Sequence, residues 1–158
     1  MTIQIDSREK ARAIEKILQE FSKQNIGHFV SKLPVGDYMS LDNARLVIDR
    51  KQNLNELCSN VRQQHDRFRR ELELANKLGI RLVILCEHGK EIKSLPDVFY
   101  WINPRLKSSP GAMTGRRLYK VLRTIQFRYG VEIQFCTKQE TGKRIIEILS
   151  GGKNGIPL

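Results

Sequence analysis

The spacing of hydrophobic residues changes several times along the chain, and each spacing predicts a type of element. Residues 2–6 alternate polar and apolar, which is typical of a short half-buried strand. Over residues 14–21 the apolar positions recur at helical spacing, which predicts a helix with one apolar stripe that ends near Ser22. Asp6 or Ser7 can cap the start of this helix. We therefore expect a strand followed by a helix that packs on a sheet.

A second pattern begins near residue 28, where short runs have the two-residue period of strands. Residues 37–41 and 45–50 flank Asp42 and Asn43, which are residue types that favour turns. This arrangement predicts a hairpin. If residues 28–33 pair as well, the hairpin becomes a three-stranded meander.

The rest of the chain alternates between helical periodicity and strand-like runs. Residues 80–87 are a continuous apolar run, the pattern of a central strand that is buried on both faces. Together the elements predict an α/β fold, in which helices flank a central mixed sheet of about five to six strands. We expect one domain over residues 1–150 and a flexible tail over 151–158. The remaining expected elements are a helical segment over 53–78 that Gly79 caps, a loop with one short helix over 88–113, a basic helix over 114–129, a strand over 131–136 and a last helix over 138–150.

Charge adds a partner class to this fold. The chain carries 28 Lys and Arg against 17 Asp and Glu, which gives a formal net charge of +11. No single basic tail accounts for the excess, and a polyanion is its natural partner. Nucleic acid is favoured over a membrane surface because no lipidation signal or basic amphipathic anchor stands out, although excess charge can also serve solubility.

Cysteine spacing and hydropathy indicate the compartment. The chain holds three cysteines, far apart and without a Cys-x-x-Cys pair, which argues against a disulfide framework and against a structural zinc site. The N-terminal residues lack the apolar segment of a secretion signal, and no stretch approaches the roughly 20 apolar residues that span a bilayer. We expect a cytoplasmic protein that does not enter a membrane.

The predicted hairpin brings charged residues together. Asp37 opens its first strand and Asp49 ends its second, so the two carboxylates become approximate cross-strand neighbours that a hard cation such as Mg²⁺ would stabilise. Lys51 follows Asp49 by two residues and therefore shares its face of the strand. A metal and a lysine at one point suit phosphodiester hydrolysis. The alternative is structural: Asp37 is a turn residue after Gly36, and Asp49 pairs with a neighbouring base.

Five short motifs, in order, carry a family resemblance. The chain resembles the nuclease domain of the XPF family of structure-specific endonucleases, in the PD-(D/E)XK superfamily, over roughly residues 3–150. The resemblance implies a restriction-endonuclease-like core. The motifs are IDSRE at 5–9, VGDY at 35–38, IDRK at 48–51, NELCSNV at 55–61 and DRFRREL at 66–72.

The resemblance also implies site residues and a cofactor. It makes Asp37, Asp49 and Asp6 ligands of Mg²⁺ or Mn²⁺, and it makes Lys51 and Arg50 catalytic residues. Asp49 stands where the family commonly has Glu, a shorter arm that can still bind a metal. Two further acids receive lower ranks: Glu9 can pair locally with an arginine, and Glu56 lies one residue farther from the lysine than is usual in the family.

Several arginines are candidates for contacts with nucleic acid. Arg62, Arg67, Arg69 and Arg70 crowd the start of a helix that follows the Asp-Arg-Lys strand, so we interpret them as a track for phosphates rather than as a solvated face. Arg8 can equally contact a phosphate or form a local salt bridge. A second basic set can equally be the outer face of its helix: Arg116, Arg117, Lys120, Arg123 and Arg128.

The leading hypothesis is a metal-dependent DNA endonuclease that acts on flaps, forks or junctions in repair, recombination or replication. The resemblance also implies pairing through the nuclease domain, so we expect a homodimer. One alternative is a noncatalytic DNA-binding scaffold with the same fold. The other is a nuclease that is less selective for structure, because the acidic site acts on the phosphate and does not distinguish DNA from RNA.

Overall fold

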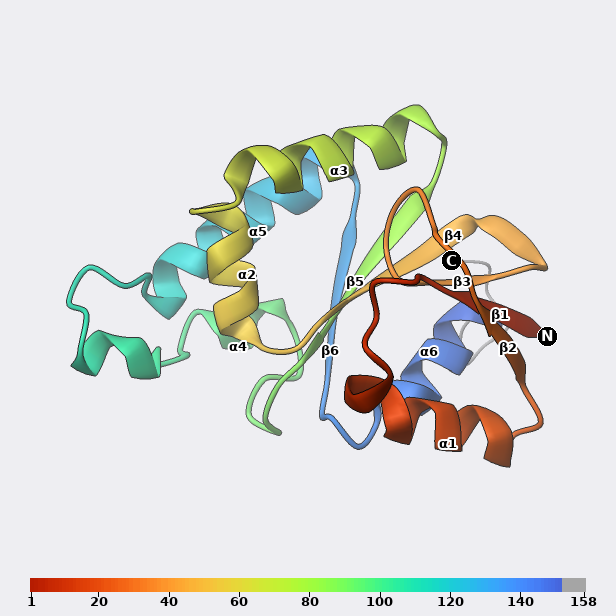
Figure 1. Cartoon of the computed structure of the whole chain (residues 1–158). Coiled ribbons are helices and arrows are strands. Elements are labelled where there is room, and N and C mark those ends of the chain that lie inside the picture. The colour runs from red at the N-terminus through yellow and green to blue at the C-terminus, as the bar shows by residue number, and fades with distance from the viewer. Residues whose placement is uncertain (152–158) are drawn as a thin grey trace.

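The strands predicted from the apolar runs form one six-stranded sheet in the computed structural model, which describes residues 1–151 (Figure 1). Their order across the sheet is β2-β1-β3-β4-β5-β6. The pairs β1–β3 and β3–β4 are antiparallel and the other pairs are parallel, which confirms the predicted mixed sheet. The strands are β1 Thr2–Ile5, β2 Gly27–Val30, β3 Tyr38–Ser40, β4 Asn43–Lys51, β5 Arg81–Glu87 and β6 Glu132–Cys136.

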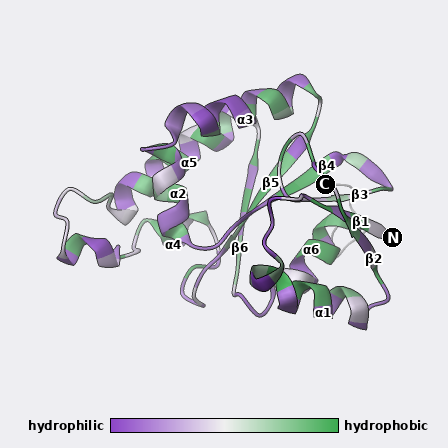
Figure 2. Cartoon of the chain, in the orientation of Figure 1, coloured by the Kyte–Doolittle hydropathy of each residue, from purple (hydrophilic) through white to green (hydrophobic). Residues whose placement is uncertain are grey.

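Helices cover both faces of this sheet, as predicted. Figure 1 shows α1 and α6 on one side of the sheet and α2, α3 and α5 on the other. Hydrophobic residues are concentrated in β5 and α6, while the outward side of α3 is hydrophilic (Figure 2). The helices are η1 Ala11–Ile14, α1 Glu15–Lys23, α2 Leu54–Val61, α3 His65–Lys77, α4 Leu95–Val98, η2 Pro104–Lys107, α5 Gly115–Tyr129 and α6 Thr141–Leu149.

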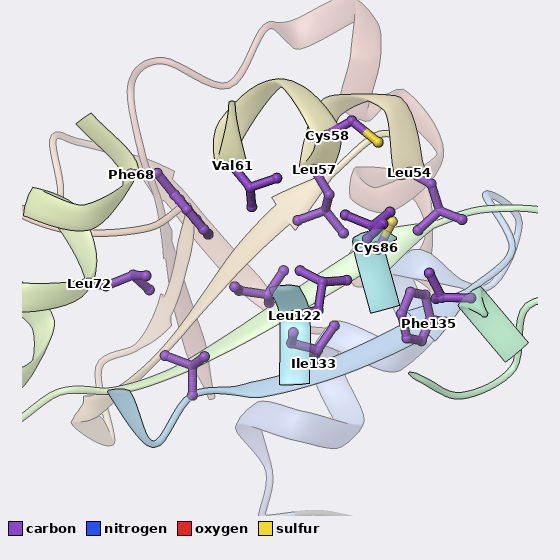
Figure 3. Close-up of a cluster of buried hydrophobic side chains, with 14 of the residues drawn as sticks. Leu54, Leu57, Cys58, Val61, Phe68, Leu72, Cys86, Leu122, Ile133 and Phe135 are labelled. Carbon is purple, nitrogen blue, oxygen red and sulfur yellow. The ribbon is translucent and has the colours of Figure 1, made fainter. Parts of the chain in front are cut away.

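The sheet divides the core into two layers, and β5 contributes side chains to both. Val83 and Leu85 pack with α1 and α6, whereas Leu82 and Ile84 pack on the other face. Burial of each of these side chains contributes roughly 1.5–3 kcal/mol. Figure 3 shows the second layer, which joins α2, α3 and α5 to the sheet through Leu57, Phe68, Leu122 and other residues. The apolar run at 80–87 is therefore a strand buried on both faces, as predicted.

The predicted hairpin of β3 and β4 is confirmed, but the alternative of a three-stranded meander is wrong. β2 does not extend the hairpin; it pairs in parallel with β1, and β1 separates it from β3. The reason is the helix α1 between β1 and β2, because a strand, a helix and a returning strand form a parallel crossover unit. The local pattern identified a strand near residue 28 but not its neighbour.

Other helix boundaries in the structure also differ from the predicted ones. Asp6 and Ser7 do not cap a helix: the 3₁₀ turn η1 starts at Ala11 and α1 follows it. The carboxylate of Asp6 instead accepts the N–H of Leu33, a residue distant in sequence. The helical segment over 53–78 is divided into α2 and α3, and the loop over 88–113 holds η2 as well as α4.

Two further predictions concern the C-terminal tail and the absence of a membrane span. Apart from Gly151, the predicted tail over 151–158 lies outside the described residues. Within residues 1–151, none of the helices combines the length and the apolar character needed to cross a bilayer.

Candidate active site

A tight turn sets the position of Asp37. Gly36 has φ of 71°, in the left-handed region, and a Cβ atom there would lie 2.5 Å from Cγ1 of Val47. Only glycine fits this approach without strain. Asp37 follows it and donates its backbone N–H to the carbonyl of Ile48 at 2.8 Å. The carboxylate is therefore held just before the start of β3, opposite the end of β4.

The end of β4 supplies the second acid and the lysine. Asp49 and Lys51 point to the same face of the strand, and Lys51 Nζ lies 3.1 Å from Asp49 Oδ2. Phe68 of α3 lies beneath the ammonium group, 5.5 Å from Nζ to the ring centroid. The backbone N–H of Arg50 donates to Asp37 Oδ2 at 2.7 Å, which ties the two strand ends together. The predicted neighbourhood of Asp37, Asp49 and Lys51 is thus present.

All three side chains line one open cavity of about 310 Å³. It lies between the ends of β3 and β4, the segment after β1, and helices α2 and α3. Acids outnumber bases in its lining, five to four. The charged residues that line it are Arg8, Glu9, Asp37, Asp49, Arg50, Lys51, Glu56, Arg67 and Glu71.

The acid pair in this cavity has a single close countercharge, Lys51, for two carboxylates. Burial and the adjacent charge of Asp49 raise the pKa of Asp37 well above its usual value. Asp49 Oδ2 is buried and, beyond its ion pair with Lys51, accepts no hydrogen bond. Two close carboxylates of this kind favour a cation between them. The pair is consequently the part of the site that is electrostatically incomplete.

The donor set fits a hard divalent cation. Within residues 1–151, no group of three or more His, Cys, Asp or Glu side chains is arranged to hold a metal by itself. Mg²⁺ does not need one, because it is usually held by one or two carboxylates and completes its shell with water and substrate phosphate oxygens. Asp37 and Asp49 are the two carboxylates that could hold it.

Arg50 has a different environment from its neighbours on β4. Its side chain is only 5% exposed, and its guanidinium lies 2.8 Å from Glu9 and 2.6 Å from Glu87. Tyr38 donates its hydroxyl to the same Glu9 oxygen at 3.0 Å. Desolvation would lower the pKa of Arg50, but the two carboxylates raise it. This residue, predicted to be catalytic, therefore lies in the cavity wall with its charge already paired.

Asp6, predicted to be a metal ligand, does not line the cavity. It is fully buried, and its carboxylate accepts the backbone N–H groups of Leu33 and Arg8 at 2.8 and 3.0 Å. The Arg8 side chain adds a 2.6 Å ion pair. Burial opposes ionisation, yet these donors lower the pKa of Asp6 overall. Its oxygens are therefore engaged in holding the segment after β1.

Three other acids reach the cavity instead. Glu9, ranked below Asp6 from sequence, lines the wall together with Glu56 and Glu71. Burial raises the pKa of Glu56, which Lys51 partly offsets. Burial and the charge of Asp49 raise the pKa of Glu71, whose carboxylate accepts the N–H of Gly36 at 3.3 Å. Sequence reasoning missed Glu71, although its place next to the arginines of α3 was a signal.

The predicted arginine track is divided by the structure. Arg67 lines the acid cavity, as does Arg8 on the opposite wall. Arg62 faces another hollow, and Arg69 forms long surface ion pairs with acids on its own helix, at 3.8 and 3.9 Å. Arg70 is exposed on α3. Only part of the track can therefore approach a phosphate in the cavity.

Comparisons with known proteins bear on the family and the fold of the chain. A model of the ERCC4 domain family matches residues 5–149. No curated protein matched the chain. The solved structure of XPF from Aeropyrum pernix is similar in fold, with a TM-score of 0.67 at 18% identity over 95% of this chain and 64% of that chain. The same protein in complex with DNA gives a TM-score of 0.63 at 18% identity, over 92% of this chain and 61% of that chain.

These matches bear on the fold and on the family. The chain spans less than two thirds of the length of the two Aeropyrum pernix chains. At their level of identity they show a shared fold and not a shared substrate. The predicted resemblance and the predicted fold class are confirmed.

Proposed function

The chain belongs to the ERCC4 domain family of DNA nucleases, and on this premise we propose that it is an Mg²⁺- or Mn²⁺-dependent endonuclease that cuts DNA at flaps, forks or junctions. The observation that carries the proposal is the pair of half-buried Asp37 and buried Asp49, which lies beside Lys51 in an open cavity on a basic protein. We propose DNA repair or recombination as its setting, in the cytoplasm or at the nucleoid or host DNA.

The roles of the residues follow from their surroundings. Asp37 and Asp49 would hold the cation, which when bound supplies Lewis-acid polarisation of a phosphate and an activated water. Lys51 keeps its proton: burial lowers its pKa, but the charges of Asp49 and Glu56 raise it overall. An ammonium group there can orient a water molecule and neutralise charge that develops on the phosphate.

The other residues support this geometry. Arg50, held by Glu9 and Glu87, fixes the end of β4 and thereby the spacing between Asp49 and Lys51. Asp6 fixes the segment that carries Glu9 through its bonds to Arg8 and Leu33. We therefore assign positioning roles to Arg50 and Asp6, and direct contacts with a phosphate to Arg67 and Arg8.

A matched pair of variants tests this proposal. Asp49→Asn keeps the size of the side chain but weakens metal binding, so cleavage should fall by at least about 10²–10³-fold while folding and DNA affinity remain. Asp42→Asn is the control, because Asp42 is an exposed carboxylate at the turn of the same hairpin. The assay uses labelled flap, fork, four-way junction, duplex and single-stranded substrates.

The outcomes separate the candidate functions. Cleavage by Asp49→Asn at the parental rate contradicts the assigned roles. Binding of branched DNA without any cleavage in Mg²⁺ or Mn²⁺ favours the noncatalytic scaffold. Equal cleavage of all substrates favours a nuclease without structural selectivity.

We also propose that the chain forms a homodimer. Large apolar side chains on its surface support this: Tyr100, Ile102 and Phe127 are 80%, 82% and 94% exposed. Burial of such side chains against a second copy is a favourable source of association energy. Light scattering at micromolar concentration should give a dimer mass, and a monomer mass contradicts the proposal.

A further inference from the structure

A second hollow, of about 240 Å³, lies on another flank of α2. Asn60 and Gln64 face the acid cavity, whereas the preceding residues Ser59 and Gln63 face this hollow. Its far wall is formed by residues 103–113, the segment that follows α4 and runs past η2 to α5 (Figure 1). One helix therefore separates the two concave sites.

The second hollow has the opposite charge character. Two of its lining residues are arginines, Arg62 and Arg105, and among the described residues that line it there is no Asp or Glu. Polar side chains with hydroxyl or amide groups, such as Ser59, Asn55 and Ser109, make up much of the remaining wall. This composition suits an anion that both arginines and several uncharged donors can contact.

Both arginines act on the same region of the hollow. Burial raises the pKa of the Cys58 thiol to about 11, and the positive charges of Arg62 and Arg105 each oppose that rise. Cys58 lies in the wall of the hollow. Arg62 and Arg105 come from segments far apart in sequence and line the same hollow.

The walls of the hollow are fixed by hydrogen bonds. Arg62 donates to the carbonyl of Gly111 at 2.9 Å, which ties the 103–113 segment to the end of α2. Asn103 is 2% exposed, donates to the carbonyl of Met113 at 2.9 Å and accepts the N–H of Arg105 at 3.0 Å. The Arg105 backbone is thus anchored, while its side chain is exposed. The hollow is a preorganised feature and not a gap beside a loose loop.

The acid cavity gives a physical reason for such a site. Five carboxylates face four bases there, and three of those bases, Arg8, Arg50 and Lys51, already form ion pairs. Without a cation, that cavity therefore offers a phosphate chain little unpaired positive charge. A nuclease of this design needs positive charge nearby that holds the strand independently of the metal.

From these observations we infer that the hollow between α2 and residues 103–113 binds a backbone phosphate of the DNA strand that enters the acid cavity. This rests on the proposed function and specifies how the substrate is held. A helix with its side chains is about 10–12 Å wide. Because each DNA strand carries one charge per about 3.4 Å of helix axis, the bound phosphate lies within a few nucleotides of the cut.

The first test measures binding, so that it does not depend on cleavage. In the full chain with Asp49→Asn, the added change Arg105→Ala should reduce the slope of log affinity against log salt by about 0.9, the value for one lost phosphate contact. Arg105→Lys should recover most of that slope. Arg45→Ala is the matched control, because Arg45 is exposed at the far end of β4. A slope for Arg105→Ala equal to that of Arg45→Ala overturns the inference.

The second test locates the phosphate. Single neutral methylphosphonates are placed at successive positions of the bound strand. One position, within a few nucleotides of the cut, should lower the salt slope by about 0.9 with Arg105 present and have no effect in Arg105→Ala. Equal responses of both proteins at every position overturn the inference. If the unmodified protein never cleaves, the proposed endonuclease fails, while the slopes still decide whether the hollow holds a phosphate.

Discussion

Two sets of buried charges lie side by side at the end of β4, and they differ in how completely they are paired. Arg50 has two carboxylates, Glu9 and Glu87, within 2.8 Å of its guanidinium. Asp49, one residue earlier, faces the opposite side and shares its space with another acid, Asp37. The pleat of one strand thus divides a four-residue motif into a complete ion cluster and an incomplete one.

The difference shows where stability and function are separated in this fold. A buried ion pair that is fully matched holds neighbouring elements in register, and removal of one member leaves a costly charge. A buried pair of like charges has no structural benefit, so its presence points to a ligand. The Arg50 cluster is accordingly a structural support, and we propose the Asp37–Asp49 pair as the reactive site.

The largest expected effect comes from breaking the complete cluster. Arg50→Leu leaves Glu9 and Glu87 buried without a countercharge, so the free energy of unfolding should fall by about 3–5 kcal/mol. Urea unfolding followed by circular dichroism measures this change. Arg45→Leu, on the same strand but exposed, is the control. Equal stability of the two variants would mean that the Arg50 cluster does not support the fold.

The next largest effect concerns Lys51 and should appear in catalysis. Lys51→Met removes the ammonium group beside Asp49 while keeping most of the side-chain volume over Phe68. The single-turnover cleavage rate with saturating Mg²⁺ should fall about 10²–10³-fold. In urea unfolding, the free energy of unfolding of Lys51→Met should fall by less than that of Arg50→Leu. A variant that cleaves normally contradicts the role of Lys51.

A smaller effect tests the repulsion between the acids. The folded protein raises the pKa of Asp37 above its ordinary value of 3.8, so it binds the proton of Asp37 more tightly than the unfolded chain does. The protonated Asp37 therefore contributes its whole share of the free energy of unfolding below pH 3.8. That contribution is lost as the pH rises through the raised pKa. In EDTA, Asp37→Asn should remove that loss and be slightly more stable than the parent at neutral pH. The advantage should vanish in acid; a variant less stable at neutral pH contradicts the repulsion.

The sequence predicted the site's central residues because their geometry is local. Asp37 and Asp49 belong to one hairpin, and Lys51 shares a face with Asp49 through the strand period. The turn position and the alternation of residues were enough to bring them together. The same holds for β5, whose continuous apolar run indicates burial on both faces.

The parts that sequence could not place depend on distant pairings. Glu87 meets Arg50 only because β4 and β5 pair in parallel, with Arg50 opposite Leu85. An acid at the end of a buried strand was a signal that a partner existed, but not which partner. Glu9 was ranked below Asp6 because a local pair with an arginine was expected, whereas its carboxylate lines the cavity and pairs with Arg50, which is distant in sequence.

The central claim is that the Asp37–Asp49 pair is completed by a divalent cation. Calorimetric titration of the metal-free protein with Mn²⁺ tests it most directly, with Asp42→Asn as the control and Asp49→Asn as the altered site. We expect the parent and Asp42→Asn to bind Mn²⁺ and to gain about 2.7 kcal/mol of stability at a hundredfold excess over Kd. Asp49→Asn should lose most of both effects. Equal Mn²⁺ binding by Asp49→Asn and the parent contradicts the account.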